Sequence, residues 1–145
     1  IMLVNAQLTG KDLINYTVNA TNVYSVGDGP TTYFTDMKGR TLYSYYTDKN
    51  NMNTFTNATL SNNAFWPMYE TDKAVVPSNL DKTLFGSITV YGHTQLTYKG
   101  WPMYYFGQDV DAVTGNYRGK NKGVYGPLPV KWPIFFKDYP AAPAN

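Results

Sequence analysis

The chain has 145 residues and a mass of 16.3 kDa, which is enough for one compact domain. Hydrophobic residues make up 43% of the sequence and charged residues 15%, so a disordered acidic or basic tail is excluded, and no apolar run approaches the roughly 20 residues of a membrane-spanning helix. The formal net charge of +2 is small for a nucleic-acid-binding domain, so we expect no nucleic-acid partner.

Residue types typical of strands and turns dominate the sequence. Thr (17), Asn (14) and Tyr (14) are abundant, and 12 Gly and 9 Pro interrupt the chain every few residues. No window therefore supports a long amphipathic helix. These features predict a mostly β protein, a compact antiparallel β domain with long loops and at most one short helix.

The first part of the chain is expected to form short strands joined by turns. Loose alternation of apolar and polar residues over 15–26 predicts one or two strands. A sharper pattern follows, in which 32–35 and 40–47 are expected to form a hairpin through the turn 36–39.

The only predicted helix covers 58–63, where Thr56 or Asn57 would cap its first turn. Beyond it the pattern returns to strands and turns. Strands are expected at 84–90 and 95–98, joined as a hairpin by the turn 91–94, and at 101–106 and 132–136. The Pro- and Ala-rich residues 140–145 are expected to lie outside the core.

An internal repeat is the most informative feature of the sequence, because 39–48 aligns without gaps to 100–109. The shared frame is Gly, two residues, an aliphatic residue, Tyr, one residue, an aromatic residue, two residues and Asp. Each copy is later followed by Trp-Pro. The motif residues are Tyr43, Tyr45, Asp48, Trp66, Tyr104, Phe106, Asp109 and Trp132. We expect a two-repeat domain over 31–138, with repeats at about 31–83 and 84–138, an N-terminal extension or leading strands over 1–30, and a tail over 139–145.

In a strand, the repeated frame would place large side chains on both faces. Tyr43 and Tyr45 would share one face, while Leu42 and Tyr46 would share the other. Such a strand must be covered on both sides, as at a seam between two repeats. Asp48, and Asp109 in the second copy, stand where the strand ends; we interpret them as acceptors for the N–H groups of the following turn, and a ligand or catalytic role is the alternative.

The doubled motif resembles the secreted bacterial repeats of unknown function, also described as predicted lipoproteins with a conserved Tyr-x-aromatic-x-x-Asp motif. The resemblance covers roughly residues 31–138. Two cysteines that family members often carry before the first Trp-Pro correspond here to Ala58 and Asn62. The resemblance implies an exported, β-rich envelope domain, sometimes lipid-anchored, and it implies no activity. Residues 1–4 carry no signal-peptide features, which we interpret as a mature or trimmed chain.

Few residues are suited to catalysis, since the chain has no Cys, one His and one Glu. His93 falls in a predicted turn, and no Gly-x-Ser-x-Gly segment presents a serine nucleophile. Glu70 and Asp72 are interpreted as loop charges rather than a glycosidase pair. We therefore expect no catalytic residues, no cofactor and no enzymatic activity.

Metal and phosphate motifs are incomplete. The segment that begins at Asp109 starts like a calcium loop, but Val113 stands where an oxygen ligand is required. The segment 115–120 is one residue short of a phosphate loop, and Asn121 replaces the magnesium-binding Ser or Thr. We expect no metal site and no nucleotide site. The basic residues Arg118, Lys120 and Lys122 are interpreted as a solvated loop, with a small anion-facing loop as the alternative.

Aromatic residues are more numerous than one small core usually needs, with 14 Tyr, 7 Phe and 3 Trp. Such rings can stack on a ligand or anchor a protein interface, or simply pair across strands. The candidates for a ligand or interface surface are Tyr46, Tyr105, Tyr117 and Tyr125.

The expected function is that of a non-enzymatic, exported cell-envelope or extracellular β domain that acts as a structural or interaction module. Its partner would be a second copy or another envelope protein. The alternative is a small-molecule or glycan-binding module with an aromatic surface between the repeats. An enzyme ranks third, and would require a strongly perturbed Asp, Glu or His in a cleft.

Overall fold

The computed structural model describes residues 2–8, 14–18, 21–25, 29–73, 76–117, 120, 122–125 and 131–145. Within these residues the protein is β-rich, and no helix exceeds four residues. The strands are β1 (Met2–Leu8), β2 (Ile14–Val18), β3 (Thr21–Ser25), β4 (Gly29–Thr35), β5 (Phe85–Val90), β6 (His93–Tyr98) and β7 (Trp101–Pro102). The 3-10 helices are η1 (Ser61–Ala64), η3 (Lys82–Leu84) and η4 (Lys122–Tyr125).

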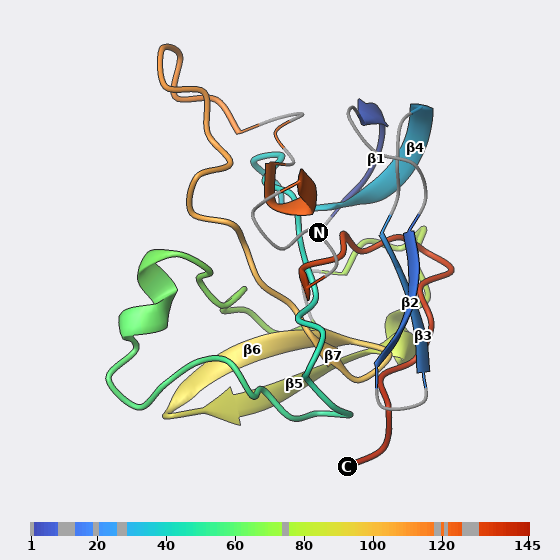
Figure 1. The fold of residues 1–145 in the computed structure, drawn as a ribbon, viewed down its shortest axis with the longest axis vertical. Coiled ribbons are helices and arrows are strands. Elements are labelled where there is room, and N and C mark those ends of the chain that lie inside the picture. The colour runs from blue at the N-terminus through green and yellow to red at the C-terminus, as the bar shows by residue number, and fades with distance from the viewer. Residues whose placement is uncertain are drawn as a thin grey trace.

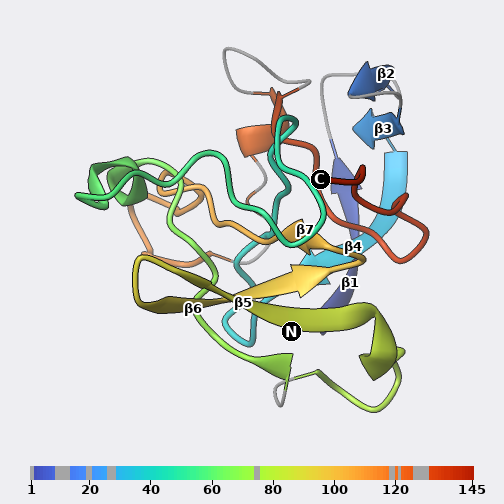
Figure 2. The same cartoon turned by 90° about the horizontal axis from the view of Figure 1, so that it is seen from below.

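All strand pairs are antiparallel. β1 pairs with β4, β2 with β3, and β5, β6 and β7 form a three-stranded sheet in chain order. Figures 1 and 2 both show the N-terminal pairs on the right of the molecule and long irregular loops on the left. The fold class predicted from composition is therefore confirmed as far as its β-rich, antiparallel character goes. In the described part of the chain, no helix has the length and apolar character to cross a membrane.

The hairpin of β5 and β6 is the best-predicted element. Val90 pairs with His93, so the connecting turn is reduced to Tyr91 and Gly92. Both turn residues have positive φ, 47° and 84°, which is the backbone shape that matches the twist of a two-residue hairpin. The strands predicted within 15–26 are also present, as β2 and β3.

The hairpin predicted from 32–35 and 40–47 forms only next to its turn, where the Asp36 N–H donates to the Arg40 carbonyl at 2.9 Å and the Leu42 N–H donates to the Phe34 carbonyl at 3.2 Å. β4 pairs along its whole length with β1, from Met2–Thr35 to Leu8–Gly29. Only an isolated bridge between Thr35 and Thr41 remains of the expected ladder. The ladder stops there because the Phe34 N–H donates to the Phe135 carbonyl instead, and the backbone after Leu42 bonds to segments far along the chain.

The strands predicted at 101–106 and 132–136 are mostly irregular. β7 ends at Pro102, and the second segment contributes one isolated bridge, from Ile134 to Tyr43. Pro102 and Pro133 have no N–H to donate, so neither segment can sustain a regular ladder. These segments stay extended and bond one residue at a time.

The helix predicted at 58–63 is a 3-10 turn at Ser61–Ala64 instead. Asn57 still bonds into this region, since its side-chain oxygen accepts from the Asn62 N–H at 3.2 Å. The helices η3 and η4 were not predicted, so the expectation of at most one short helix is also wrong.

Residues 140–145, expected to lie outside the core, are tied to the body of the domain. The indole N–H of Trp101 donates to the Pro140 carbonyl at 2.8 Å, and the Asn50 N–H donates to the Pro143 carbonyl at 2.8 Å. Pro143 is buried. The segment forms no strand, but its Pro140 and Pro143 carbonyls still need hydrogen-bond donors, and the body of the domain supplies them.

Two aromatic clusters form the core, on opposite faces of the 41–46 and 102–106 segments. The Tyr43 cluster has Tyr33, Tyr43, Met68, Val90, Tyr104, Trp132 and Ile134 at its centre, with Tyr45, Trp66 and Phe106 among the residues packed against it. The Phe34 cluster includes Phe34, Leu42, Leu96, Tyr98, Trp101, Met103 and Phe135, with Tyr46 and Tyr105 packed against it. The predicted alternation of the two motif segments is thus confirmed.

Candidate functional site

Tyr43 and Tyr104 lie side by side at the centre of the Tyr43 cluster. They form an antiparallel bridge in which the Tyr43 N–H donates to the Tyr104 carbonyl at 2.8 Å and the Tyr104 N–H donates back at 2.9 Å. Both side chains are completely buried. The two copies of the motif therefore meet at their equivalent tyrosines.

Each tyrosine hydroxyl is bonded to the aspartate of the other motif copy. Tyr104 donates to Asp48 Oδ2 at 2.7 Å, and Tyr43 donates to Asp109 Oδ2. Asp48 is 0% exposed and Asp109 2% exposed, so neither carboxylate has access to bulk solvent. We call this arrangement of four residues the Tyr–Asp clamp.

The second oxygen of each aspartate accepts a backbone N–H. Asp48 Oδ1 accepts from the Thr54 N–H at 2.7 Å and from the Thr54 hydroxyl at 2.8 Å. Asp109 Oδ1 accepts from the Lys122 N–H at 2.7 Å. These amides lie further along the chain than the adjoining turn that the sequence suggested, but the carboxylates do hold backbone.

Burial controls the protonation of the clamp. It raises the pKa of Asp48 from 3.8 to about 7, against the hydrogen bonds from Tyr104 and Thr54, which lower it. Burial likewise raises the pKa of Asp109 to about 7, against the hydrogen bonds from Tyr43 and Lys122. Burial and the neighbouring aspartate hold the pKa of Tyr43 and of Tyr104 well above 10, so both phenols remain donors.

The two motif tryptophans stack on each other beside the clamp. The rings of Trp66 and Trp132 are nearly parallel, with centroids 3.8 Å apart and an interplanar angle of 4°. Tyr45 lies 4.4 Å from Trp132, and Phe106 lies 4.4 Å from Trp66. All eight motif residues predicted from the sequence are therefore brought together in one cluster.

Backbone hydrogen bonds join the two motif copies to the Trp-Pro segments in a matched way. The second Trp-Pro segment bonds to the first motif copy, and the first Trp-Pro segment bonds to the second motif copy. The bonds are Ser44 N to Pro133 O (2.9 Å), Tyr105 N to Pro67 O (2.8 Å), Phe135 N to Leu42 O (3.1 Å) and Tyr69 N to Met103 O (2.9 Å). Every bond of one copy thus has a counterpart at the equivalent positions of the other.

The four candidate surface tyrosines have different surroundings. Tyr46 packs against the Phe34 cluster, and the Lys131 ammonium lies 5.1 Å from its ring centre. Tyr105 and Tyr117 both contact the guanidinium of Arg40 through their rings. The side chain of Tyr125 lies outside the described residues.

A groove of about 380 Å³ contains the guanidinium of Arg40. The central carbon of the guanidinium lies 4.0 Å from the Tyr105 ring centre and 5.0 Å from the Tyr117 ring centre. The groove, which we call the Arg40 groove, is lined by Asp36, Met37, Lys38, Arg40, Tyr69, Glu70, Thr71, Tyr105 and Tyr117. Sequence reasoning missed Arg40; the available signal was its place directly after the repeated glycine, where the second copy has Trp101.

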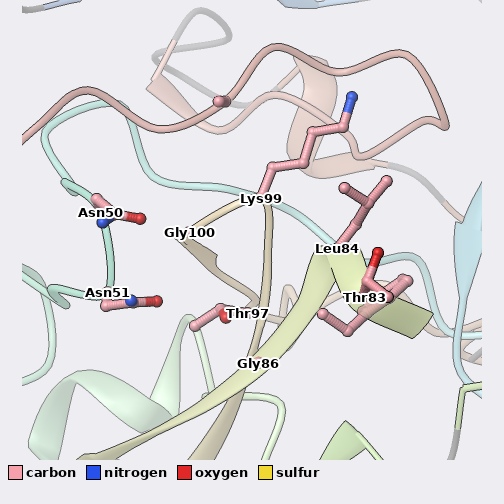
Figure 3. Close-up of a pocket in the computed structure, with 10 residues that line it drawn as sticks. Asn50, Asn51, Thr83, Leu84, Gly86, Thr97, Lys99 and Gly100 are labelled. Carbon is pink, nitrogen blue, oxygen red and sulfur yellow. The ribbon is translucent and has the colours of Figure 1, made fainter. Parts of the chain in front are cut away.

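A second hollow, of about 540 Å³, lies against the three-stranded sheet (Figure 3). Asn50 and Asn51 project into it from one side, and Asn50 Oδ1 lies so close to Gly100 that a Cβ there would overlap it. The Lys99 ammonium at its edge points away and donates to the Tyr139 carbonyl at 2.8 Å. This hollow offers amides and hydroxyls but no carboxylate for acid–base chemistry.

Two other titratable side chains considered from the sequence, His93 and Glu70, form a pair with each other. His93 Nδ1 lies 2.5 Å from Glu70 Oε1 in a partly exposed pair. Across the residues that the structure describes, no three His, Cys, Asp or Glu side chains gather as a metal site.

No family model matches the chain, and neither does any curated protein or solved structure. Function is therefore argued from the geometry of the clamp and of the Arg40 groove.

Proposed function

We propose that this chain is a non-enzymatic, exported β domain of two repeats that serves as a structural or interaction module of the cell envelope or extracellular space. The observation that carries the proposal is the reciprocal Tyr–Asp clamp. Its buried polar atoms are bonded to one another and to backbone, which is how a structural element behaves.

The two-repeat organisation is supported by the matching of contacts. Tyr43 and Tyr104 bridge each other, each motif aspartate accepts from the other motif's tyrosine, and the Trp66 and Trp132 rings stack. An arrangement in which each contact has a counterpart is expected when two similar units pack about a pseudo-twofold axis. A single unit would leave its aspartate without the tyrosine hydroxyl that the other unit supplies.

A non-enzymatic role is supported by the state of the two aspartates with raised pKa. A raised pKa in a cleft is a usual sign of an acid–base catalyst, but such a group must reach its substrate. Asp48 and Asp109 are almost completely buried, and their oxygens already accept hydrogen bonds. Their raised pKa is explained by burial alone.

Export is supported by the resemblance of the doubled motif to secreted bacterial repeats. The Thr-, Asn- and Tyr-rich composition is in keeping with an extracellular domain. The test is to treat intact cells of the source organism with a protease that cannot enter them. An exported domain loses its immunoblot signal under this treatment, whereas a signal retained until the cells are lysed contradicts export.

The structural role is tested by native mass spectrometry of the protein isolated from its own source. Subunits at the bare 16.3 kDa mass, assembled as a multimer or with a protein partner, are the expected result. A monomer that carries a discrete small-molecule mass would overturn the structural role.

That second outcome would favour the other candidate function, a small-molecule or glycan-binding module. The specific observation in its favour is the Arg40 groove, in which two of the tyrosines singled out from the sequence line one hollow with a charged side chain.

A further inference from the structure

We propose that the Arg40 groove binds the carboxylate of an acidic saccharide. The inference rests on the second candidate function and names its ligand class. It starts from Arg40, whose guanidinium carries five N–H donors. Within the described part of the chain, no hydrogen bond or ion pair engages that guanidinium, and its Nε is buried without an acceptor.

The guanidinium at this position, whose charge also acts on Asp109, has terminal N–H groups that can engage an external acceptor. The rings of Tyr105 and Tyr117 hold the group from two sides, which restricts its orientation. The buried Nε is out of reach of a ligand, whereas the terminal N–H groups of this planar group can match a carboxylate in bidentate fashion. The groove therefore presents a prepositioned carboxylate receptor.

The carboxylates already in the groove do not meet this need. Asp36 accepts from the Lys38 N–H at 2.8 Å, from the Arg40 N–H at 2.9 Å and from the Tyr105 hydroxyl at 2.8 Å. Glu70 is paired with His93 at 2.5 Å. The exposed Lys38 adds a second cation at the rim, so two cations face two carboxylates in the groove, and the carboxylates already hold hydrogen bonds whereas the guanidinium holds none.

The aromatic and polar lining favours a saccharide as the carrier of that carboxylate. The partly exposed Tyr117 supplies ring surface, and Thr71 supplies a hydroxyl. A neighbouring hollow of about 680 Å³ shares Lys38 and Tyr117 with the groove and adds Asn116. An extended chain of sugar rings could continue from one hollow into the other, whereas a small free anion would use only the guanidinium.

The test is isothermal titration calorimetry of the full chain with the trimer of galacturonic acid and with its methyl-esterified form. The two probes share the same sugar rings and differ in charge. We expect the acid to bind at least tenfold more tightly than the ester. Arg40→Lys keeps the charge but loses the bidentate geometry, and it should weaken binding of the acid at least tenfold.

Two further variants keep the proposal testable if Arg40 substitutions impair folding. Lys38→Gln changes an exposed rim residue and should weaken binding severalfold, and Tyr117→Ala removes ring surface shared by the two hollows and should weaken it tenfold. Lys82→Gln is the matched control, because Lys82 is exposed and does not line the groove, and it should bind as the parent does.

The outcomes separate this inference from the function on which it rests. Equal binding of acid and ester that Tyr117→Ala abolishes would overturn the role of charge and leave saccharide binding standing. No binding of either trimer would overturn both. Preferential binding of an acidic peptide over the trimer would overturn the saccharide and point to a protein partner.

Discussion

Tyr43 and Tyr104 bond to each other through their backbones, and the hydroxyl of each bonds to the aspartate that follows the other in sequence. Each motif copy thus supplies a donor to the buried carboxylate of the other. A buried carboxylate that loses its donor is strongly unfavourable. The clamp is therefore expected to couple the stability of the two motif segments.

Removing one hydroxyl from the clamp should destabilise the whole domain. In Tyr104→Phe the ring remains while Asp48 Oδ2 loses its only side-chain donor. We expect the free energy of unfolding to fall by about 1.5 to 3 kcal/mol, as for other hydrogen bonds to charged groups. Chemical denaturation measures it, and Tyr46→Phe is the control, since Tyr46 lies outside the clamp. An equal loss in both variants would contradict the clamp.

A double-mutant cycle should identify the partners. Tyr104→Phe combined with Asp48→Asn should show a coupling energy above about 0.5 kcal/mol, because the two side chains share one hydrogen bond. The mismatched combination of Tyr104→Phe with Asp109→Asn should be closer to additive. Stronger coupling in the mismatched pair would exclude the crossed arrangement.

The clamp should make stability depend on pH in an unusual direction. The pKa of Asp48 and that of Asp109 are raised from 3.8 to about 7, so the folded state holds these protons more tightly than the unfolded state. Their contribution is complete below pH 4 and is lost as the pH rises to 7. Unfolding free energy, measured by denaturation at several pH values, should fall over this range.

The position of the stability maximum and the Asp48→Asn variant both test whether the clamp causes this pH dependence. Hydrogen bonds from Thr83 and from the Val113–Thr114 turn lower the pKa of Asp81 and of Asp111, so these groups lose their small contribution only below pH 4. Stability should therefore peak near pH 4. Asp48→Asn removes one titrating group and should flatten the decline between pH 4 and 7. An unchanged slope in that variant would assign the effect elsewhere.

The sequence was sufficient to predict features that depend on local pattern. The alternation of Tyr43 with Leu42 places them in different clusters, and the Tyr91-Gly92 turn closes the β5–β6 hairpin. Both follow from the period of a strand and from turn chemistry. The motif residues also lie in one cluster. They could be identified beforehand because the repeated frame is visible in the sequence without knowledge of the fold.

Features that depend on long-range competition were not predictable. The partner of β4 is β1, although the turn after Thr35 suggested a hairpin with the residues that follow. Nothing local to Asp48 indicates that Tyr104 will reach it, because their contact joins residues 56 positions apart in the sequence. Arg40 was missed for the same reason, since its importance comes from the rings that flank it.

Close packing around Gly123 gives a test of the contact between η4 and the clamp. A Cβ at this position would lie 2.7 Å from Trp66 and from Tyr43. Gly123→Ala should lower the free energy of unfolding by about 1 to 3 kcal/mol, the usual range for overpacking. In combination with Trp66→Phe, which removes the nearest indole atom, the loss should shrink. Persistence of the full loss would place the strain elsewhere.

Truncation of the C-terminal segment tests whether it belongs to the folded domain. Ending the chain after Tyr139 removes the carbonyls that accept from Trp101 and Asn50, and also removes Ala142, whose N–H donates to Lys99. We expect a loss of about 2 kcal/mol in denaturant titrations, from three hydrogen bonds worth roughly 0.5 to 1.5 kcal/mol each. Ending the chain after Pro143 removes two exposed residues, keeps all three bonds, and should leave stability unchanged. Equal stability of the two truncated chains would show that the segment is an undocked tail.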